Sequence, residues 1–173
     1  MQKLLLAGAI GLSLVGCATT GTTVPSEPMK DYQRIVEIPN IKQDVIYENS
    51  RQWVAKSFKS ANSVIQYQDK TAGSIIGKGN VDFSCANFLK CYGRTQPVLE
   101  FTFQIDAKDD KARVSFSDIN IHHPAGYVSG TMAQAITYPA TTEQEKTQVK
   151  TILDNAINSL STDIKKTSVN SQW

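Results

Sequence analysis

The stretch LEFTFQIDAKDDKARVSF, residues 99–116, decides the fold class of this chain. Apolar and polar residues alternate along both of its halves, and a Lys-Asp-Asp-Lys run at 108–111 separates the two. Successive side chains of a strand point to opposite faces, so the pattern predicts two half-buried antiparallel strands joined by a turn. The apolar parity then shifts to Ile119 and Ile121, which predicts a β-bulge near residues 117–118.

A strand and a helix are predicted upstream of this hairpin. Residues 32–38 are rich in β-forming residues, and Pro39 should end the strand. Asn40 is expected to cap a helix over residues 41–59. Its apolar residues fall on one stripe at helical spacing, which indicates a helix that packs on a core. These stripe residues are Ile46, Trp53, Val54 and Phe58.

A second hairpin is predicted between that helix and residue 99. Its strands are expected at 64–68 and 74–83, and the Asp, Lys and Gly of residues 69–73 suit the turn. Gly77 and Gly79 share the apolar face of the second strand. Because glycine has no side chain, we expect shallow places there that a helix or a large ring can approach closely.

The chain closes with an amphipathic helix. Residues 142–145, Thr-Glu-Gln-Glu, form a capping box at its start, and Lys165 and Lys166 are expected near its negative end. The apolar residues between them form one stripe. This stripe consists of Val149, Ile152, Leu153, Ala156, Ile157, Leu160 and Ile164.

These elements predict an α+β domain: a single curved antiparallel sheet of about five strands with two helices packed on one face, in the order β-α-β-β-β-β-α. The segments YQRIVEIPN (32–40) and RQWVAKSFKSANSVIQYQDKTAGSIIGKGNV (51–81), the FTFQI hairpin and the closing helix resemble the DUF4468 family, described as having a TBP-like fold. The likeness covers about residues 31–163.

The resemblance implies an architecture but no activity, since the family name records no established function. A fold shared with the TATA-binding protein implies nothing about DNA. The chain departs from the family pattern in the insert 84–97, which holds two cysteines, and in the long stretch 122–141. A particular role of this protein is expected to lie in these departures.

The N-terminus predicts export and lipid attachment. Lys3 precedes an uncharged apolar core at residues 4–16, which is too short to cross a bilayer and is typical of an export signal. Leu14-Val15-Gly16-Cys17 resembles the lipobox of bacterial lipoproteins, which implies cleavage before Cys17 and acylation of its thiol. An ordinary signal with a chance cysteine is the alternative. Ala18, by resemblance to sorted lipoproteins, favours the outer membrane, with the domain facing the periplasm.

Four segments follow from this interpretation. They are a signal peptide at 1–16, the lipidated cysteine and a flexible Thr-, Gly- and Pro-containing tether at 17–30, a folded domain at 31–166, and a tail at 167–173. Loss of Lys3 from the 18 Lys and Arg leaves 17 basic residues against 16 acidic ones. This near balance does not favour nucleic acid as a partner. The expected partner is the lipid bilayer, through acylated Cys17.

Cys85 and Cys91 remain as a close pair after lipidation of Cys17. In an oxidising envelope compartment such a pair is usually a disulfide that closes a small loop. Two free thiols or half of a metal site are the alternatives, although the C-x5-C spacing matches no zinc or redox motif.

No complete catalytic motif is found. The glycine-rich run 73–79 has three residues between its first two glycines and no Ser or Thr after Lys78, so it does not match a phosphate-binding loop. The Gly-Tyr-Val-Ser-Gly run around Ser129 lacks nucleophile-elbow spacing. Adjacent His122 and His123 should point to opposite faces of a strand and lack an evident third ligand. We therefore expect no metal and no cofactor.

The segment 122–141 has no clear period and is the predicted contact region, since long connections in compact domains are often functional. Its candidate contact residues are His122, His123, Tyr127, Met132 and Tyr138. The leading hypothesis is a noncatalytic module that binds an envelope protein or a cell-wall component. Two alternatives remain: an envelope enzyme, and a carrier of a small ligand on the sheet face. The residues of that enzyme would be Asp118, His122, His123 and Ser129.

Overall fold

The hairpin predicted from residues 99–116 forms the centre of the sheet. The structure is a computed structural model and describes residues 27–58, 64–84, 96–128 and 130–170. In it, β4 (Val98–Lys108) pairs antiparallel with β5 (Lys111–His123), and burial alternates along both strands. Asp110 adopts a left-handed φ of 66° in the turn between them.

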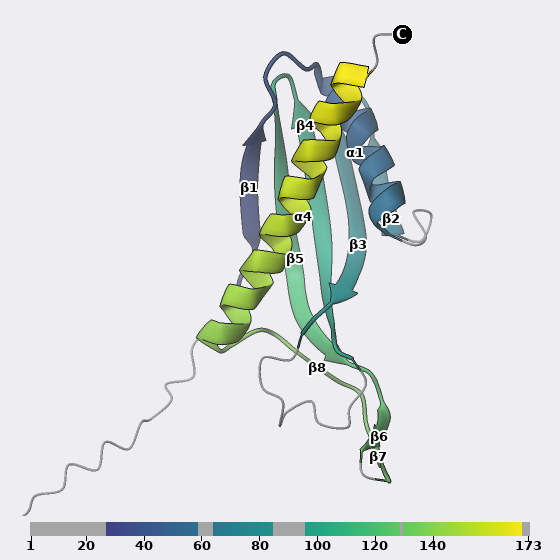
Figure 1. Cartoon of the computed structure of the whole chain (residues 1–173), viewed down its shortest axis with the longest axis vertical. Coiled ribbons are helices and arrows are strands. Elements are labelled where there is room, and N and C mark those ends of the chain that lie inside the picture. Colours follow the sequence, from purple (N-terminus) through teal and green to yellow (C-terminus); the bar gives the residue numbers. More distant parts are fainter. Residues whose placement is uncertain (1–26, 59–63, 85–95, 129, 171–173) are drawn as a thin grey trace, which may run out of the picture.

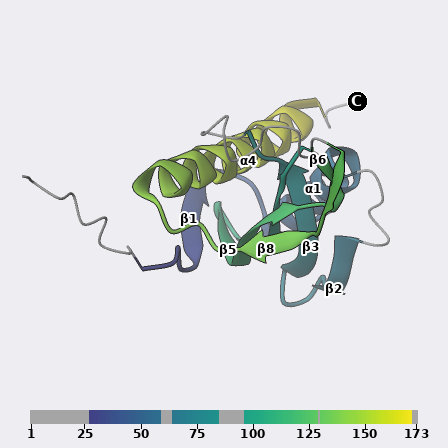
Figure 2. The ribbon, with the colours of Figure 1, turned by 90° about the horizontal axis from the view of Figure 1, so that it is seen from below.

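The main sheet has the strand order β1-β5-β4-β3-β2, and β8 also pairs with β5. Its other strands are β1 (Tyr32–Glu37), β2 (Ile65–Asp69), β3 (Ser74–Asp82) and β8 (Ile136–Tyr138). The helices α1 and α4 lie on one face of this curved sheet (Figures 1 and 2). The predicted fold class is confirmed, with β8 as an additional short strand.

The predicted bulge is present in β5. Glu100 pairs with Asn120 but Thr102 pairs with Ser117, so two residues of β5 oppose Phe101 of β4. Asp118, one of the two, has a φ of 51°. Because a bulge adds one residue to the strand, the residues beyond it return to the apolar face in the shifted parity.

The helix α1 (Gln43–Ser57) begins later than predicted, and its cap is not Asn40. Asn40 adopts a φ of 64° and belongs to the turn before the helix. The backbone N–H of Gln43 instead donates to Asp109 Oδ1 at 2.8 Å. The cap comes from the β4–β5 turn, far away in the sequence, so local sequence signals place it wrongly.

The helix α4 (Glu143–Asn170) starts with the predicted capping box. Glu145 N donates to Thr142 Oγ1 at 3.2 Å, and Thr142 N donates to Glu145 Oε2 at 3.1 Å. The helix continues past the predicted domain boundary at residue 166, so Lys165 and Lys166 do not lie in its last turn. None of the helices in the described residues is long and apolar enough to span a membrane.

The segment 122–141 is more ordered than the sequence predicts. β5 extends to His123, and β6 (Gly126–Val128) and β7 (Thr131–Ala133) form a separate two-stranded hairpin. Strands of three residues are too short to produce a detectable period, so the sequence of this segment shows none. This hairpin and β8 extend from one end of the sheet (Figures 1 and 2).

Candidate functional site

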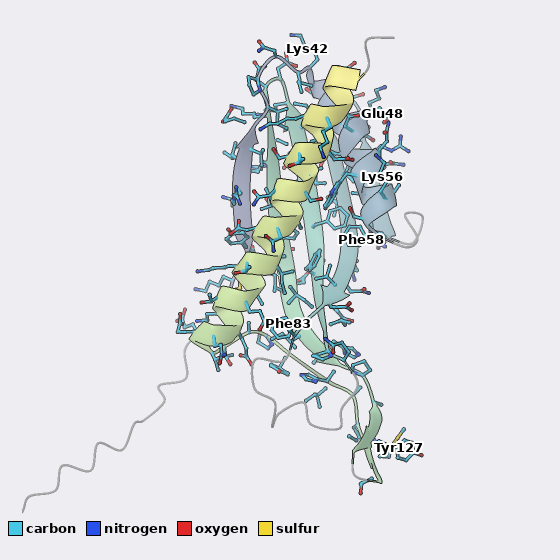
Figure 3. All side chains as sticks on the ribbon, in the orientation of Figure 1. Lys42, Glu48, Lys56, Phe58, Phe83 and Tyr127 are labelled. Carbon is cyan, nitrogen blue, oxygen red and sulfur yellow. The ribbon has the colours of Figure 1, made fainter. Side chains whose placement is uncertain are left out.

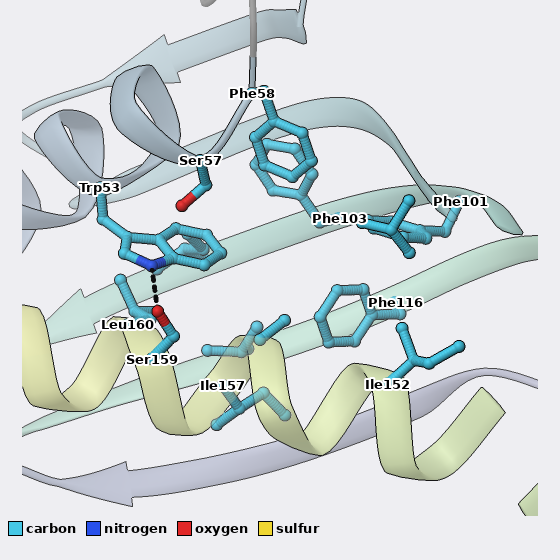
Figure 4. Close-up of a pocket in the computed structure, with 14 residues that line it drawn as sticks. Trp53, Ser57, Phe58, Phe101, Phe103, Phe116, Ile152, Ile157, Ser159 and Leu160 are labelled. Atoms are coloured by element: carbon cyan, nitrogen blue, oxygen red, sulfur yellow. Dashed lines mark hydrogen bonds between the residues drawn. The ribbon is translucent and has the colours of Figure 1, made fainter. Parts of the chain in front are cut away.

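An apolar pocket of about 250 Å³ lies between the two helices and the sheet (Figure 4). The end of α1, the middle of α4 and the strands β3, β4 and β5 line it. Aromatic rings form much of the wall. They belong to Trp53, Phe58, Phe101, Phe103 and Phe116.

The pocket exists because the two helices differ in length. α1 ends at Ser57, whereas α4 has 28 residues and crosses the same face of the sheet (Figure 1). Beyond the end of α1, Phe58 supplies the cover: its ring stacks on that of Phe103 at 5.6 Å between centroids. Trp53 meets Phe58 edge to face at 6.1 Å. The wall is therefore built from interlocking rings.

Two glycines of β3 permit this ring packing. A Cβ added at Gly79 would lie 2.7 Å from Phe58 Cε1 and 2.8 Å from Phe101 Cε2. A Cβ added at Gly77 would lie 2.5 Å from Phe103 Cζ. Such contacts are closer than side chains tolerate, so the expectation that these glycines admit large rings is confirmed.

The few polar groups of the pocket are uncharged. Trp53 Nε1 donates to Ser159 Oγ at 3.1 Å, which links α1 to α4 at the pocket (Figure 4). Ser57 is the other polar side chain among the described residues that line it. Because these described residues include no ionisable group, they offer no acid, base or metal ligand. They can bind an apolar group by removing it from water.

The far wall of the pocket is held against β1 by an ion pair. Tyr32 Oη donates to Asp154 Oδ1 at 2.7 Å, and Arg34 donates to the same oxygen. The hydrogen bond from Arg34, and then that from Tyr32, lowers the pKa of Asp154 below its ordinary value of 3.8. Asp154 lies in sequence between Ile152 and Ala156, which line the pocket, and these bonds tie this part of α4 to β1.

The opposite face of the sheet carries a polar hollow of about 490 Å³. Charged side chains of both signs line it, including Lys78, Glu100 and Asp118. Asp118 Oδ2 accepts a hydrogen bond from Thr102 Oγ1 at 2.9 Å. The mixed charge is typical of a solvated sheet face.

The proposed enzyme residues do not share one described site. Asp118 is exposed beside Thr102, whereas His122 Nδ1 lies 2.8 Å from Thr137 Oγ1. His123 is 3% exposed and lies on the apolar side of β5, so the two histidines point to opposite faces as predicted. Ser129 lies outside the described residues. The convergence that an enzyme would need is thus not seen among the three described candidates.

Besides His122, the four other predicted contact residues fall into two groups. The rings of His123 and Tyr138 stack at 5.8 Å, and His123 Nε2 lies 3.2 Å from Tyr138 Oη, so this pair fastens β8 to β5. Tyr127 is 73% exposed and Met132 is 55% exposed, and the two pair directly across β6 and β7. Of these four residues, Tyr127 and Met132 are the ones open to a partner.

The structure does not test the predictions for the three cysteines. Cys17, Cys85 and Cys91 all lie outside the described residues. The ends of the cysteine-containing insert are joined, because Phe83 N donates to the carbonyl of Pro97 at 2.9 Å.

Sequence reasoning did not locate the pocket. The glycines of β3 signalled the close approach of rings, but the empty volume depends on where α1 stops relative to α4. That relation has no local sequence signature.

One comparison with a solved structure supports the architecture. A TBP-like protein from Parabacteroides distasonis superimposes with a TM-score of 0.53 at 17% identity, covering 77% of this chain and 96% of the other. A DUF4468 family protein from Bacteroides ovatus reaches a TM-score of 0.44 at 16% identity, covering 77% and 78% of the two chains. At such identities the first likeness shows the fold alone. No curated protein matches this chain.

The sequence itself matches a family model over residues 32–122, from the start of β1 to the last residue but one of β5. That model describes a domain of unknown function with a TBP-like fold. The matched residues make up more than half of the chain and include the central hairpin from which the fold was predicted. This chain belongs to the DUF4468 family.

Proposed function

We propose that this chain is a lipid-anchored protein of the cell envelope whose DUF4468 domain is a noncatalytic binding module for an apolar group. The observation that carries the proposal is the pocket of about 250 Å³ between α1, α4 and the sheet. Its described lining is aromatic and aliphatic, with Trp53, Ser57 and Ser159 as the polar exceptions. Small-ligand sites generally combine a mostly apolar wall with a few placed polar groups.

The size of the pocket limits the ligand. An apolar protein cavity of about 150 Å³ can hold benzene, so this pocket has room for a ring or a short stretch of acyl chain. A buried charge is costly without a charged or hydrogen-bonding partner, and the described lining provides no ionisable one. The ligand class is therefore a neutral apolar group, which includes the acyl end of a lipid.

The envelope location rests on the first residues of the chain. Lys3, the apolar core at 4–16 and the Gly16-Cys17 site favour export and acylation, and Ala18 favours the outer membrane. At about 0.8 kcal/mol per buried methylene, two or more acyl chains hold a protein stably on a bilayer. The pocket would then lie within reach of lipids on the periplasmic side.

A titration followed by methyl NMR tests the pocket. The probe is n-octanol, and the reporters are the methyl groups of Ile152 and Ile157 in the pocket wall. We expect saturable shifts at both. Ile35 is 61% exposed on the sheet edge strand β1 and serves as the internal control. Shifts that do not saturate, or that are equally large at Ile35, contradict the proposal.

A matched pair of variants makes this titration specific. Ala156→Leu adds a larger side chain to the pocket wall and should weaken octanol binding by at least about tenfold, equivalent to ~1.4 kcal/mol. Asn155→Leu makes a similar change at the exposed neighbouring position and should leave binding unchanged. Equal affinity for octanol in the two variants would show that octanol binds outside the pocket.

The anchor is tested separately in cells. Cys17→Ser removes the thiol that would carry the acyl group, so metabolic incorporation of labelled palmitate and sedimentation with outer membranes should both be lost. Processing and sedimentation that are unchanged in this variant would refute the lipoprotein assignment without affecting the pocket.

A further inference from the structure

The hairpin formed by β6 and β7, here called the arm, exposes an apolar pair at its surface. Tyr127 and Met132 lie opposite each other, at 73% and 55% exposure. Tyr127 projects at the tip of the molecule in Figure 3. Ile136, at the start of β8, is 43% exposed and belongs to the same end. Half of the large exposed hydrophobic residues among the described ones therefore lie in the segment from β6 to β8.

The arm lies in a part of the chain that carries no charge. Residues 119–142 contain no Asp, Glu, Lys or Arg. The turn at the opposite end of the sheet reads Lys108-Asp109-Asp110-Lys111. Moving charged groups toward lipid is costly, whereas an uncharged segment with an exposed Tyr and Met avoids that cost.

The described N-terminus is fastened at the same end of the molecule. Met29 N donates to the carbonyl of Ala140 at 2.8 Å, just before α4 begins. Figure 1 places the start of α4 and the arm at the end of the sheet that lies far from the β4–β5 turn. Nine residues, 18–26, separate Cys17 from the described chain and can reach at most about 30 Å, so lipid on Cys17 would hold the bilayer close to this end.

We propose that the arm is a membrane contact, in which Tyr127 and Met132 enter the headgroup region and set the orientation of the anchored domain. This inference rests on the proposed lipid anchor at Cys17. Tyrosine suits the membrane interface because its ring is apolar and its hydroxyl stays hydrated. Two side chains bind lipid weakly by themselves, but the tether raises their effective concentration at the surface. The domain then stands with its charged end away from the bilayer.

Depth-dependent fluorescence quenching tests the contact on the full lipidated protein. The protein is placed in phosphatidylethanolamine and phosphatidylglycerol vesicles that contain brominated acyl chains, which quench indole inside the bilayer. Tyr127→Trp introduces an indole on the arm. Tyr67→Trp is the matched control, since Tyr67 is 50% exposed on β2 outside the arm. Trp53 and Trp173 are common to both variants, so only the difference between the variants is interpreted.

We expect several-fold stronger quenching for Tyr127→Trp than for Tyr67→Trp. Adding Met132→Asp to the Tyr127→Trp variant should reduce this quenching toward the control level, because it places a charge at the contact. Equal quenching in the two single variants, while the protein still sediments with vesicles, overturns the arm contact and leaves the anchor standing.

Two other outcomes also overturn it. If the lipidated protein does not sediment with vesicles, both the proposed anchor and the proposed arm contact are wrong. A blue-shifted emission of Tyr127→Trp that is insensitive to brominated lipid would assign the arm to a contact with protein, such as a second copy of the chain.

Discussion

The two ends of the sheet are closed by different chemistry. At the end that holds the β2–β3 and β4–β5 turns, charged side chains accept backbone hydrogen bonds and form ion pairs. At the end that holds β6, β7 and β8, short strand pairings and a ring stack join the strands, the Glu145 carboxylate caps α4, and apolar side chains remain exposed. The turns at one end are thus held by contacts within the chain, whereas the other end leaves Tyr127, Met132 and Ile136 exposed.

The charged end is tied together by two neighbouring carboxylates. Asp109 accepts from Gln43 N at 2.8 Å and from Lys42 Nζ at 3.0 Å, so it caps α1. Asp110 Oδ1 accepts from Asn40 N at 2.7 Å. One turn of the sheet thereby determines where the helix begins, and its two carboxylates are engaged in the fold.

The largest effect on stability is expected in the middle of the sheet. There α1 has ended, and aromatic rings pack on the sheet instead. Gly79→Val would push a branched side chain into the rings of Phe58 and Phe101, which lie 2.7 and 2.8 Å from an added Cβ. We expect the free energy of unfolding to fall by about 1–3 kcal/mol, as measured by urea denaturation. Lys78→Val, on the exposed face of the same strand, should change it by less than about 0.5 kcal/mol. Similar losses in both variants would contradict the ring packing.

A smaller effect is expected at the other end of the sheet, where α4 begins. Thr142→Ala removes the oxygen that accepts from Glu145 N and should cost about 1 kcal/mol in thermal or urea unfolding. Thr151→Ala is the control, because this exposed mid-helix threonine has no capping role and alanine favours a helix. If the two variants were equally stable, the capping box would contribute nothing to this end.

The smallest effect is expected from acid, and it should appear at the charged end. The hydrogen bond from Gln43 N, and then that from Lys42, holds the pKa of Asp109 below its ordinary value of 3.8. Burial alone would raise the pKa of Asp106, but hydrogen bonds from Gln104, Arg113 and Ser74 together lower it. A lowered folded-state pKa gives stability that is present above 3.8 and is lost as the pH falls through the folded value.

Hydrogen exchange measured across this pH range checks the location of the acid effect. Amides at the start of α1 should lose protection before those of β8 as the pH falls below 3.8. Asp109→Asn keeps an accepting oxygen but removes the titration, so it should flatten the pH dependence at Gln43. Simultaneous loss at both ends would show that the carboxylates of the charged end do not act locally.

Several features of this fold follow from local pattern. The strict alternation of residues 99–116 defined the central hairpin, and the parity shift at Ile119 located the bulge, because a period of two has only one way to place its apolar face. The capping box at residue 142 marked the start of α4, since both of its partners lie within one turn. These interactions join residues that are close in sequence or that pair across one hairpin.

The features that depend on distant contacts were missed or left open. The cap of α1 was assigned to Asn40 because Asp109 lies more than sixty residues away, where no local rule can find it. The pocket arises from the relative lengths and packing of α1 and α4, and the exposure of Tyr127 arises from a hairpin of three-residue strands.

By itself, the sequence determined the sheet, its helices and the family to which the chain belongs, since periodicity and capping act over a few residues. Only the tertiary structure decided which face stays open, where an apolar volume remains and which candidate residues meet. Those properties depend on how whole elements pack, and packing joins residues that the sequence keeps far apart.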